Sequence, residues 1–280
     1  MAVDGVPFFP QRQHHCGPAA LATVLGAGGV DVHPDELARA VYLPGRQGSL
    51  QVEMLAAARR QGFMAVRVGG AGDSGGALPA AILAELTAGR PVLVLQNLGL
   101  DFWPFWHYAV VVGYQPDRDR FVLRSGRERQ RLIGRTRLAA TLARAGDWAV
   151  VVIPPGAPPG GLDARAYLQA AADLESTGAH DAALAAFRTA AATWPDRPAG
   201  GLGVANNLYY LGRLDAAEAA YRALLADHPG HPVAVHNLAT LLVEGGRACE
   251  ARPLLPAAAD GGAAALIDTA RRLVADACPD

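Results

Sequence analysis

Helical and extended patterns of apolar residues follow one another in the first half of the chain. Four helical stretches, rich in Ala and Leu, begin near Cys16, His33, Leu50 and Ala77. Short Val-rich runs bounded by Gly, Pro or Asp come later and predict strands that begin near Pro91, His107, Arg120 and Trp148. Helices that precede strands favour an α+β domain over alternating βαβ units. We expect this domain to occupy residues 1–153.

A second domain is predicted after the Pro/Gly-rich segment 154–161, which breaks regular structure and is typical of a linker. Residues 162–280 are Ala-rich and helical in pattern, and Gly178, Gly212 and Gly246 recur at intervals of 34 residues. Other residue types recur at the same offset, as Ala183 and Ala217, Phe187 and Tyr221, and Pro195 and Pro229. This layout resembles tetratricopeptide repeats, which implies an array of helical hairpins with a concave surface for a protein partner. The last helical segment is expected to cap the array.

The composition narrows the function classes. The chain has 280 residues, of which 51% are apolar and 18% charged, and its formal net charge is −1. A net charge near zero disfavours a nucleic-acid binder that works by bulk electrostatics. The sequence shows no phosphate-binding glycine loop, and we expect no cofactor.

Targeting features are also missing from the sequence. No apolar run is long enough for an integral membrane segment. The first residues lack the features of a signal peptide, which predicts a cytoplasmic protein, or an exported or lipid-anchored one if the start has been trimmed. Cys16, Cys249 and Cys278 are too few and too scattered to predict a disulfide framework.

Cys16 is the first candidate for chemistry. It begins the stretch CGPAALATVL, in which Pro18 suits the first turn of a helix because its missing N–H needs no partner there. Cys16 is therefore expected at a helix N-terminus, where the partial positive charge favours the nucleophilic thiolate. A small buried cysteine that only packs is the alternative.

His107 is the second candidate. It opens the predicted strand HYAVVVGY, so its ring is expected at the rim of a sheet. A histidine in that place can take a proton from a thiol and later give one to a leaving amine. Taken alone, it is better explained as a core or loop residue.

Residues 5–153 resemble the bacteriocin-processing type of papain-like cysteine peptidase, which cuts after double-glycine leader motifs. The resemblance rests on VPFFPQ, CGPAALATVL, PVLVL and HYAVVVGY, in this order. It implies Cys16 as the nucleophile and His107 as general base and then acid. It also implies that the Gln11 amide lines the oxyanion hole with the backbone N–H of Cys16; Gln13 is the competing candidate.

The residue that would orient His107 departs from the family pattern. The family has Asp or Asn, followed by Pro, where this chain has Ser125 and Gly126. Ser125 can accept a hydrogen bond from the imidazole but carries no charge to stabilise imidazolium, which lowers the expected rate. Asp101 and Asn97 are the other candidates for this role.

Three weaker signals lie near these residues. His14 and His15 precede Cys16, but no partner cluster has zinc-like spacing, so we expect no metal site. Eight arginines between Arg118 and Arg137 predict a solvated hairpin beside the candidate site. A face that binds an anion or a nucleic acid, or an acidic region of a substrate, is the alternative. An aromatic cluster before His107 is expected to pack in the ordinary way or to form a wall of a substrate cleft; it consists of Phe102, Trp103, Phe105 and Trp106.

The sequence therefore predicts a papain-like α+β cysteine peptidase domain followed by an all-α tetratricopeptide-like repeat domain. We expect it to hydrolyse peptide bonds through Cys16 and His107, while the repeats recruit a peptide or protein substrate or a protein partner. The alternative is a catalytically weak or inactive peptide-binding scaffold, which Ser125 favours. Hydrolysis of an amide, or acyl transfer, on a non-protein substrate would use the same residues.

Overall fold

The chain divides into two compact units between Thr177 and Gly178. The computed structural model describes residues 1–12, 14–69, 77–255 and 262–279. The first unit contains α1 (Cys16–Ala27), α2 (Pro34–Val41), η1 (Pro44–Arg46), α3 (Gln51–Arg60), β1 (Met64–Arg67), α4 (Leu78–Thr87), β2 (Val92–Asn97), β3 (Trp106–Gln115), η2 (Pro116–Arg118), β4 (Arg120–Ser125), β5 (Glu128–Gly134), α5 (Arg135–Ala143), β6 (Ala149–Ile153) and α6 (Ala164–Ser176). Helices that precede most of the strands confirm the α+β expectation.

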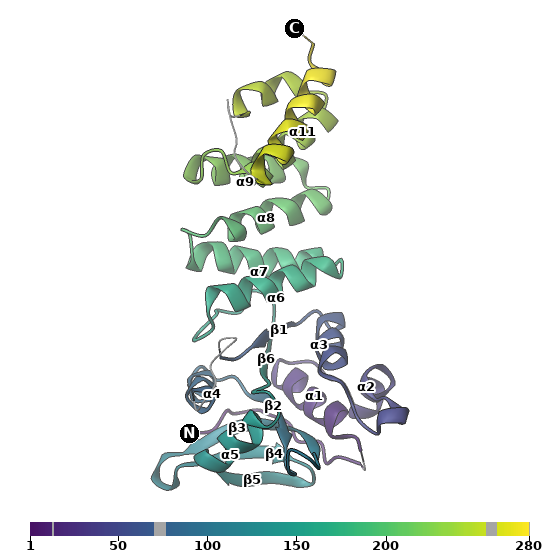
Figure 1. The fold of residues 1–280 in the computed structure, drawn as a ribbon, viewed down its shortest axis with the longest axis vertical. Coiled ribbons are helices and arrows are strands. Elements are labelled where there is room, and N and C mark those ends of the chain that lie inside the picture. The colour runs from purple at the N-terminus through teal and green to yellow at the C-terminus, as the bar shows by residue number, and fades with distance from the viewer. Residues whose placement is uncertain (13, 70–76, 256–261, 280) are drawn as a thin grey trace. The chain divides into compact units, whose positions relative to one another are not determined.

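A six-stranded sheet with the order β1-β6-β2-β3-β4-β5 forms the centre of the first unit, and neighbouring strands are antiparallel. One face packs against α1, where Leu21 and Leu25 lie in one core with Val110 and Val150. On the other face, the Gln96 amide donates to Thr141 of α5 over 2.7 Å. Figure 1 shows α1, α2 and α3 gathered on one side of the strands. Because helices cover both faces of the sheet, almost all residues of β2 and β3 are buried. This explains why their sequences are continuous Val-rich runs.

The Pro/Gly-rich segment is held against the first unit. Arg90, which follows α4, donates to the carbonyls of Pro158 and Pro159 over 2.9 and 3.0 Å. It also pairs with the buried Glu85, whose pKa is raised because burial outweighs the attraction of Arg90. An ion pair between Arg59 and Asp173 joins α3 to α6. These contacts explain why the first unit extends through α6. The linker at 154–161 and a domain boundary at residue 153 stay predictions from composition.

The second unit is helical and repeats its element boundaries. It contains α7 (His180–Thr193), α8 (Pro198–Tyr210), α9 (Leu214–Asp227), α10 (Pro232–Glu244), η3 (Ala248–Leu254) and α11 (Gly262–Ala277). Helices α9 and α10 begin and end 34 residues after α7 and α8. The three glycines singled out by their spacing, Gly178, Gly212 and Gly246, all have positive φ values of 77°, 70° and 68°. Glycine adopts this left-handed conformation without the steric cost that a side chain adds, which explains its recurrence at each turn.

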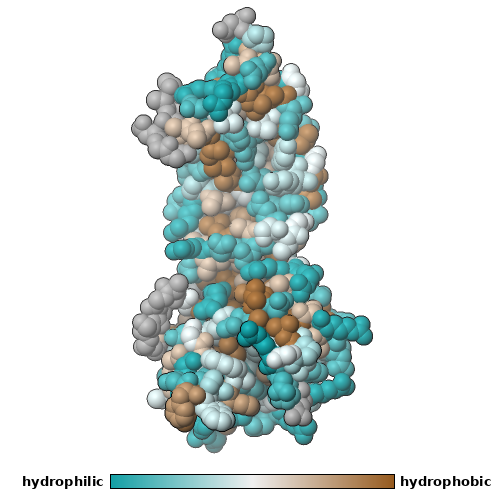
Figure 2. Space-filling view, turned by 45° about the vertical axis from the view of Figure 1, so that its right-hand side comes forward, coloured by the Kyte–Doolittle hydropathy of each residue, from teal (hydrophilic) through white to brown (hydrophobic). Residues whose placement is uncertain are grey.

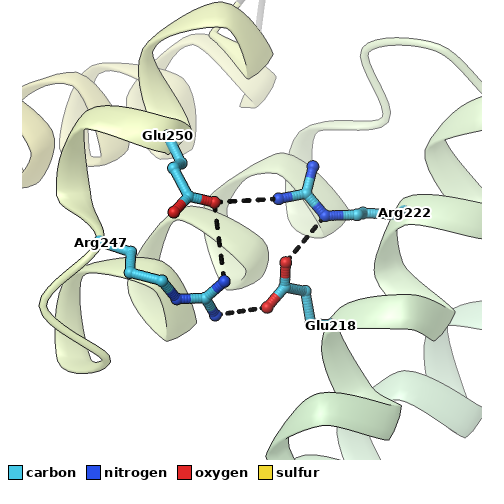
Figure 3. Close-up of polar contacts among 4 residues, drawn as sticks. All are labelled: Glu218, Arg222, Arg247 and Glu250. Atoms are coloured by element: carbon cyan, nitrogen blue, oxygen red, sulfur yellow. Dashed lines mark hydrogen bonds and ion pairs between the residues drawn. The ribbon is translucent and has the colours of Figure 1, made fainter.

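Polar and covalent links fasten η3 to its neighbours. Glu218 and Arg222 of α9 form an ion-pair network with Arg247 and Glu250, in which each carboxylate contacts both guanidinium groups (Figure 3). A disulfide joins Cys249 of η3 to Cys278, 29 residues further along the chain. The spacing of the cysteines did not predict this disulfide.

The surface carries hydrophobic residues in small separate groups on the face shown in Figure 2. Among the described residues, no helix is both long and apolar enough to cross a bilayer.

Candidate active site

Cys16 is the first residue of α1, as the CGPAA motif predicts. The helix that follows is buried over its first two turns, and this fixes the position of the thiol. Gly17 has no space for a side chain, because an added Cβ would collide with Ser49 and approach Met54. The glycine after Cys16 is therefore required for close packing of the helix start against α3 and the segment before it.

A small pocket of about 10 Å³ brings three of the predicted site residues together: Gln11, Cys16 and Ser125. Gln11 is held there by its backbone N–H, which donates to the Gly126 carbonyl over 3.1 Å. The other residues that line the pocket are Phe8, Phe9, Ala19, Ala20, Thr23, Tyr108, Arg124 and Gly126. The segment before α1 and the turn after β4, more than 100 residues apart in sequence, thus share one wall. Gln13 lies outside the described residues.

His107 adjoins this pocket through Ser125. It is the second residue of β3 and only 7% of its surface is exposed. Its Nε2 atom lies 2.8 Å from the Ser125 hydroxyl, which leaves Nδ1 as the ring nitrogen without a partner among the described residues. Of the three candidates for the orienting residue, Ser125 is the one in contact with the imidazole.

The other two candidates have different surroundings. The Asn97 side chain accepts from the N–H groups of Gly99 and Phe105, both over 3.0 Å, and so holds the β2–β3 loop. Asp101 is an exposed residue of that loop. Neither side chain has a hydrogen bond to His107 in the described part of the chain.

The Cys16 sulfur lies beside the start of β3. The backbone N–H groups of Tyr108 and Gly17 point at it and favour the thiolate. No hydrogen bond links this sulfur to the His107 ring within the described residues. Cys16 therefore contacts β3 through the backbone N–H of Tyr108, the residue that directly follows His107. Sequence patterns gave no sign of this donor.

The charge states differ from the sequence-based expectation. Burial raises the pKa of the Cys16 thiol and outweighs the N–H groups that lower it. The helix start does favour the thiolate, as expected, through the N–H groups of Cys16 and Gly17, but burial has the larger effect on the pKa. Burial, and then the positive charge of Arg131, lower the pKa of His107 to about 4. At neutral pH the site holds a thiol and a neutral imidazole.

The two histidines before Cys16 have no metal-like arrangement. The His15 ring packs edge-on against Tyr42 at a centroid distance of 4.7 Å, and His14 is exposed. Across the described residues, no group of three His, Cys, Asp or Glu side chains is placed to hold a metal ion.

The arrangement combines a half-buried cysteine at a helix start with a glutamine and a Ser–His pair on an antiparallel sheet. Cysteine hydrolases use residues of these types. Residues 3–130 match the sequence model of the Peptidase_C39 like family. The first unit thus contains a Peptidase_C39-like domain, which bears out that part of the resemblance.

Part of the chain is similar to three solved structures of peptidases. A protein from Bacillus anthracis described as a C39-like peptidase is 16% identical, with a TM-score of 0.44 over 54% of this chain and 96% of that chain. The peptidase domain of Streptococcus ComA, a bifunctional ABC transporter of a quorum-sensing pathway, is 20% identical, with a TM-score of 0.40 over 53% and 98%.

A third is the double-glycine motif protease of an AMS/PCAT transporter, in complex with its leader peptide; it is 18% identical, with a TM-score of 0.38 over 54% and 91%. No curated protein matches the chain.

Proposed function

We propose that the first unit is a papain-like cysteine peptidase in which Cys16 is the nucleophile and His107 the general base and acid. The observation that carries this proposal is one pocket wall that unites Cys16, Gln11 and the serine that holds His107. A site that only binds peptides does not need a thiol, an amide donor and an imidazole together.

The reaction follows from the roles of these groups. The imidazole takes the thiol proton, and the sulfur attacks the carbonyl carbon of the scissile peptide bond. The oxyanion accepts hydrogen bonds from the Gln11 amide and the Cys16 backbone N–H. The imidazolium then protonates the leaving amine, and the C–N bond breaks to leave a thioester. Water, deprotonated by His107, hydrolyses this thioester and restores the thiol.

The resting geometry implies slow chemistry without substrate. Cys16 and His107 are both neutral, because burial opposes charge on each of them. The pocket is too small for a peptide, with room for roughly one water molecule. Peptide binding must therefore widen the site and bring the ring nitrogen to the sulfur. Unfolded segments with a small residue such as glycine at the cut fit this narrow site best.

A peptide-binding scaffold with little or no activity is the second candidate function. Ser125 stands where a carboxylate would stabilise imidazolium, and Arg131 disfavours the charged ring further. Both features make the protonated, imidazolium form of His107 less stable, and the reaction needs this form as its general acid.

For the second unit, we propose tetratricopeptide-like repeats that bind a protein partner or substrate. Supporting this, a cavity of about 150 Å³ opens between residues of α8, α9 and α10. Within it, Asn206 accepts hydrogen bonds from the Tyr221 hydroxyl and the Asn237 amide, over 2.7 and 3.0 Å. Such fixed polar groups suit the main chain of an extended peptide.

The experiment that tests the peptidase is digestion of a degenerate peptide library by the full chain, with new termini identified by mass spectrometry. We expect cleavage by the native chain and none by Cys16→Ala, with Cys249→Ser/Cys278→Ser as a control that keeps Cys16. Equal cleavage by Cys16→Ala would exclude this nucleophile. Saturable peptide binding without any cleavage, in both chains, would establish the scaffold instead.

A further inference from the structure

The loop between β2 and β3 is a fixed structure rather than a loose connection. The Asn97 side chain holds it from inside, because its Oδ1 accepts from Gly99 and Phe105 and its Nδ2 donates to the Leu100 carbonyl over 3.4 Å. Backbone bonds between Leu100 and Trp103, each 3.1 Å, close the turn. Gly99 leaves no room for a Cβ, which would collide with the Trp103 carbonyl. We call residues 98–106 the aromatic loop.

Large apolar side chains of the aromatic loop project into solvent. Their exposed fractions are 59% for Leu100, 82% for Phe102, 78% for Trp103, 62% for Phe105 and 52% for Trp106. Ordinary packing, one of the two roles expected for this cluster, is therefore wrong. Because exposing apolar area to water is unfavourable, a patch of this kind marks a surface that binds another molecule or a membrane.

Positive charge lies at the same end of the sheet. Trp106 directly precedes His107, which contacts Ser125 at the end of β4, so the β4–β5 turn adjoins the loop. Arg127 in this turn and Arg129, the second residue of β5, are exposed, and neither side chain forms an ion pair among the described residues. Glu128, between them in sequence, is paired with Arg131 over 3.4 Å.

We propose that the aromatic loop inserts its side chains into the interface of an anionic lipid bilayer, with Arg127 and Arg129 against the lipid phosphates. Tryptophan and phenylalanine favour the boundary between headgroups and acyl chains. All five apolar side chains of the loop are more than half exposed, which suits a soft medium better than a shaped protein groove. Arginines near the loop complement anionic headgroups and strengthen binding to such a surface.

This binding would place the Cys16 pocket at the membrane surface, because β3 leads directly from the loop to His107. The contact is peripheral and uses one short loop. It is independent of the peptidase proposal, since insertion requires no thiol chemistry.

The test is cosedimentation of the full chain with vesicles of phosphatidylcholine alone or mixed with phosphatidylglycerol, in the Cys16→Ala background so that proteolysis plays no part. We expect pelleting with the anionic vesicles, weakened by salt, and a blue shift of tryptophan fluorescence. Phe102→Ser/Trp103→Ser should weaken the partition by roughly tenfold or more, because binding scales with buried apolar area.

Matched control variants distinguish insertion of the loop from misfolding and from nonspecific hydrophobic adsorption. Val52→Ser/Leu214→Ser removes apolar residues that are 61% and 49% exposed elsewhere, and it should leave partition unchanged. Arg127→Ser/Arg129→Ser should reduce the preference for anionic vesicles while the fluorescence shift with bound vesicles persists. The proposal is overturned if the native loop binds neither vesicle, or if the loop and control variants lose partition equally. It is also overturned if the loop variant leaves vesicle partition unchanged and, when made in the chain that keeps Cys16, changes only the KM for peptides.

Discussion

Replacing Ser125 by aspartate should raise the pKa of His107 and speed turnover. The Ser125 hydroxyl lies 2.8 Å from Nε2 of the ring, so a carboxylate at this position can accept a charge-assisted hydrogen bond from imidazolium. An opposite charge at such range changes a pKa by about 1 to 3. From its value of about 4, the histidine should therefore reach roughly 5 to 7. The fraction of imidazolium at pH 7 then rises by about 10- to 500-fold.

The assay is an NMR titration of the His107 ring, alongside peptide cleavage by the same variants. Ser125→Asn is the matched control, because it offers a hydrogen bond of similar geometry without charge and should leave the pKa of His107 low. Arg131→Gln should raise the pKa of His107 by removing the nearby positive charge. An unchanged pKa in Ser125→Asp, or an equal rise in Ser125→Asn, would refute the electrostatic reasoning.

Three further predictions concern the thiol, acid stability and the disulfide. Alkylation of Cys16 by iodoacetamide should accelerate only above the ordinary thiol pKa of about 8.5, because burial raises its pKa; a midpoint near pH 6 would contradict this. Since His107 has a lower pKa in the folded chain than its ordinary 6.5, its stabilisation is complete above about pH 6.5. It is lost as the pH falls toward 4, by about 3 kcal/mol in total. Urea unfolding should show that His107→Asn removes this acid sensitivity, and equal pH dependence would disprove it. Reduction of the Cys249–Cys278 disulfide, whose residues are 29 apart, should lower the free energy of unfolding of the second unit by about 3 to 4 kcal/mol. Calorimetry with and without reductant measures this, Cys16→Ser serving as the control that should not change it.

Elements with a strong hydrophobic pattern could be predicted from the sequence. The Val-rich runs became β2 and β3 because both faces of the central sheet are covered. The edge strand β5 was predicted only as part of a solvated hairpin and not as a separate strand, because its sequence ERQRLIG is mostly polar and mostly exposed. The neighbouring α5 escaped prediction, since its arginines obscure the few buried positions of RTRLAATLA.

Composition also suggested a linker at residues 154–161, a segment that contacts the first unit in the structure. The Pro/Gly-rich stretch looks like a break in the sequence, but Arg90 binds two of its carbonyls. A one-dimensional pattern cannot reveal this contact, because its partners are 68 and 69 residues apart.

The candidate site shows the same limits. Motifs identified Gln11, Cys16 and His107, but the spatial pairing chose Ser125 over Asn97 as the partner of the histidine. The raised pKa of the thiol also depends on what covers it, and the covering residues come from distant parts of the chain. The disulfide could not be predicted either, because nothing in the sequence around Cys249 and Cys278, which are 29 residues apart, shows that the two side chains lie close together.

Acid-quenched turnover of an N-acylglycine p-nitrophenyl ester, followed by peptide mapping of the full chain, tests the central chemistry most directly. A thioester on Cys16 is expected in the native chain, in greater amount than in His107→Ala, and none is expected in Cys16→Ala. An acyl group on another residue, or ester turnover that continues at the native rate in Cys16→Ala, would contradict the account.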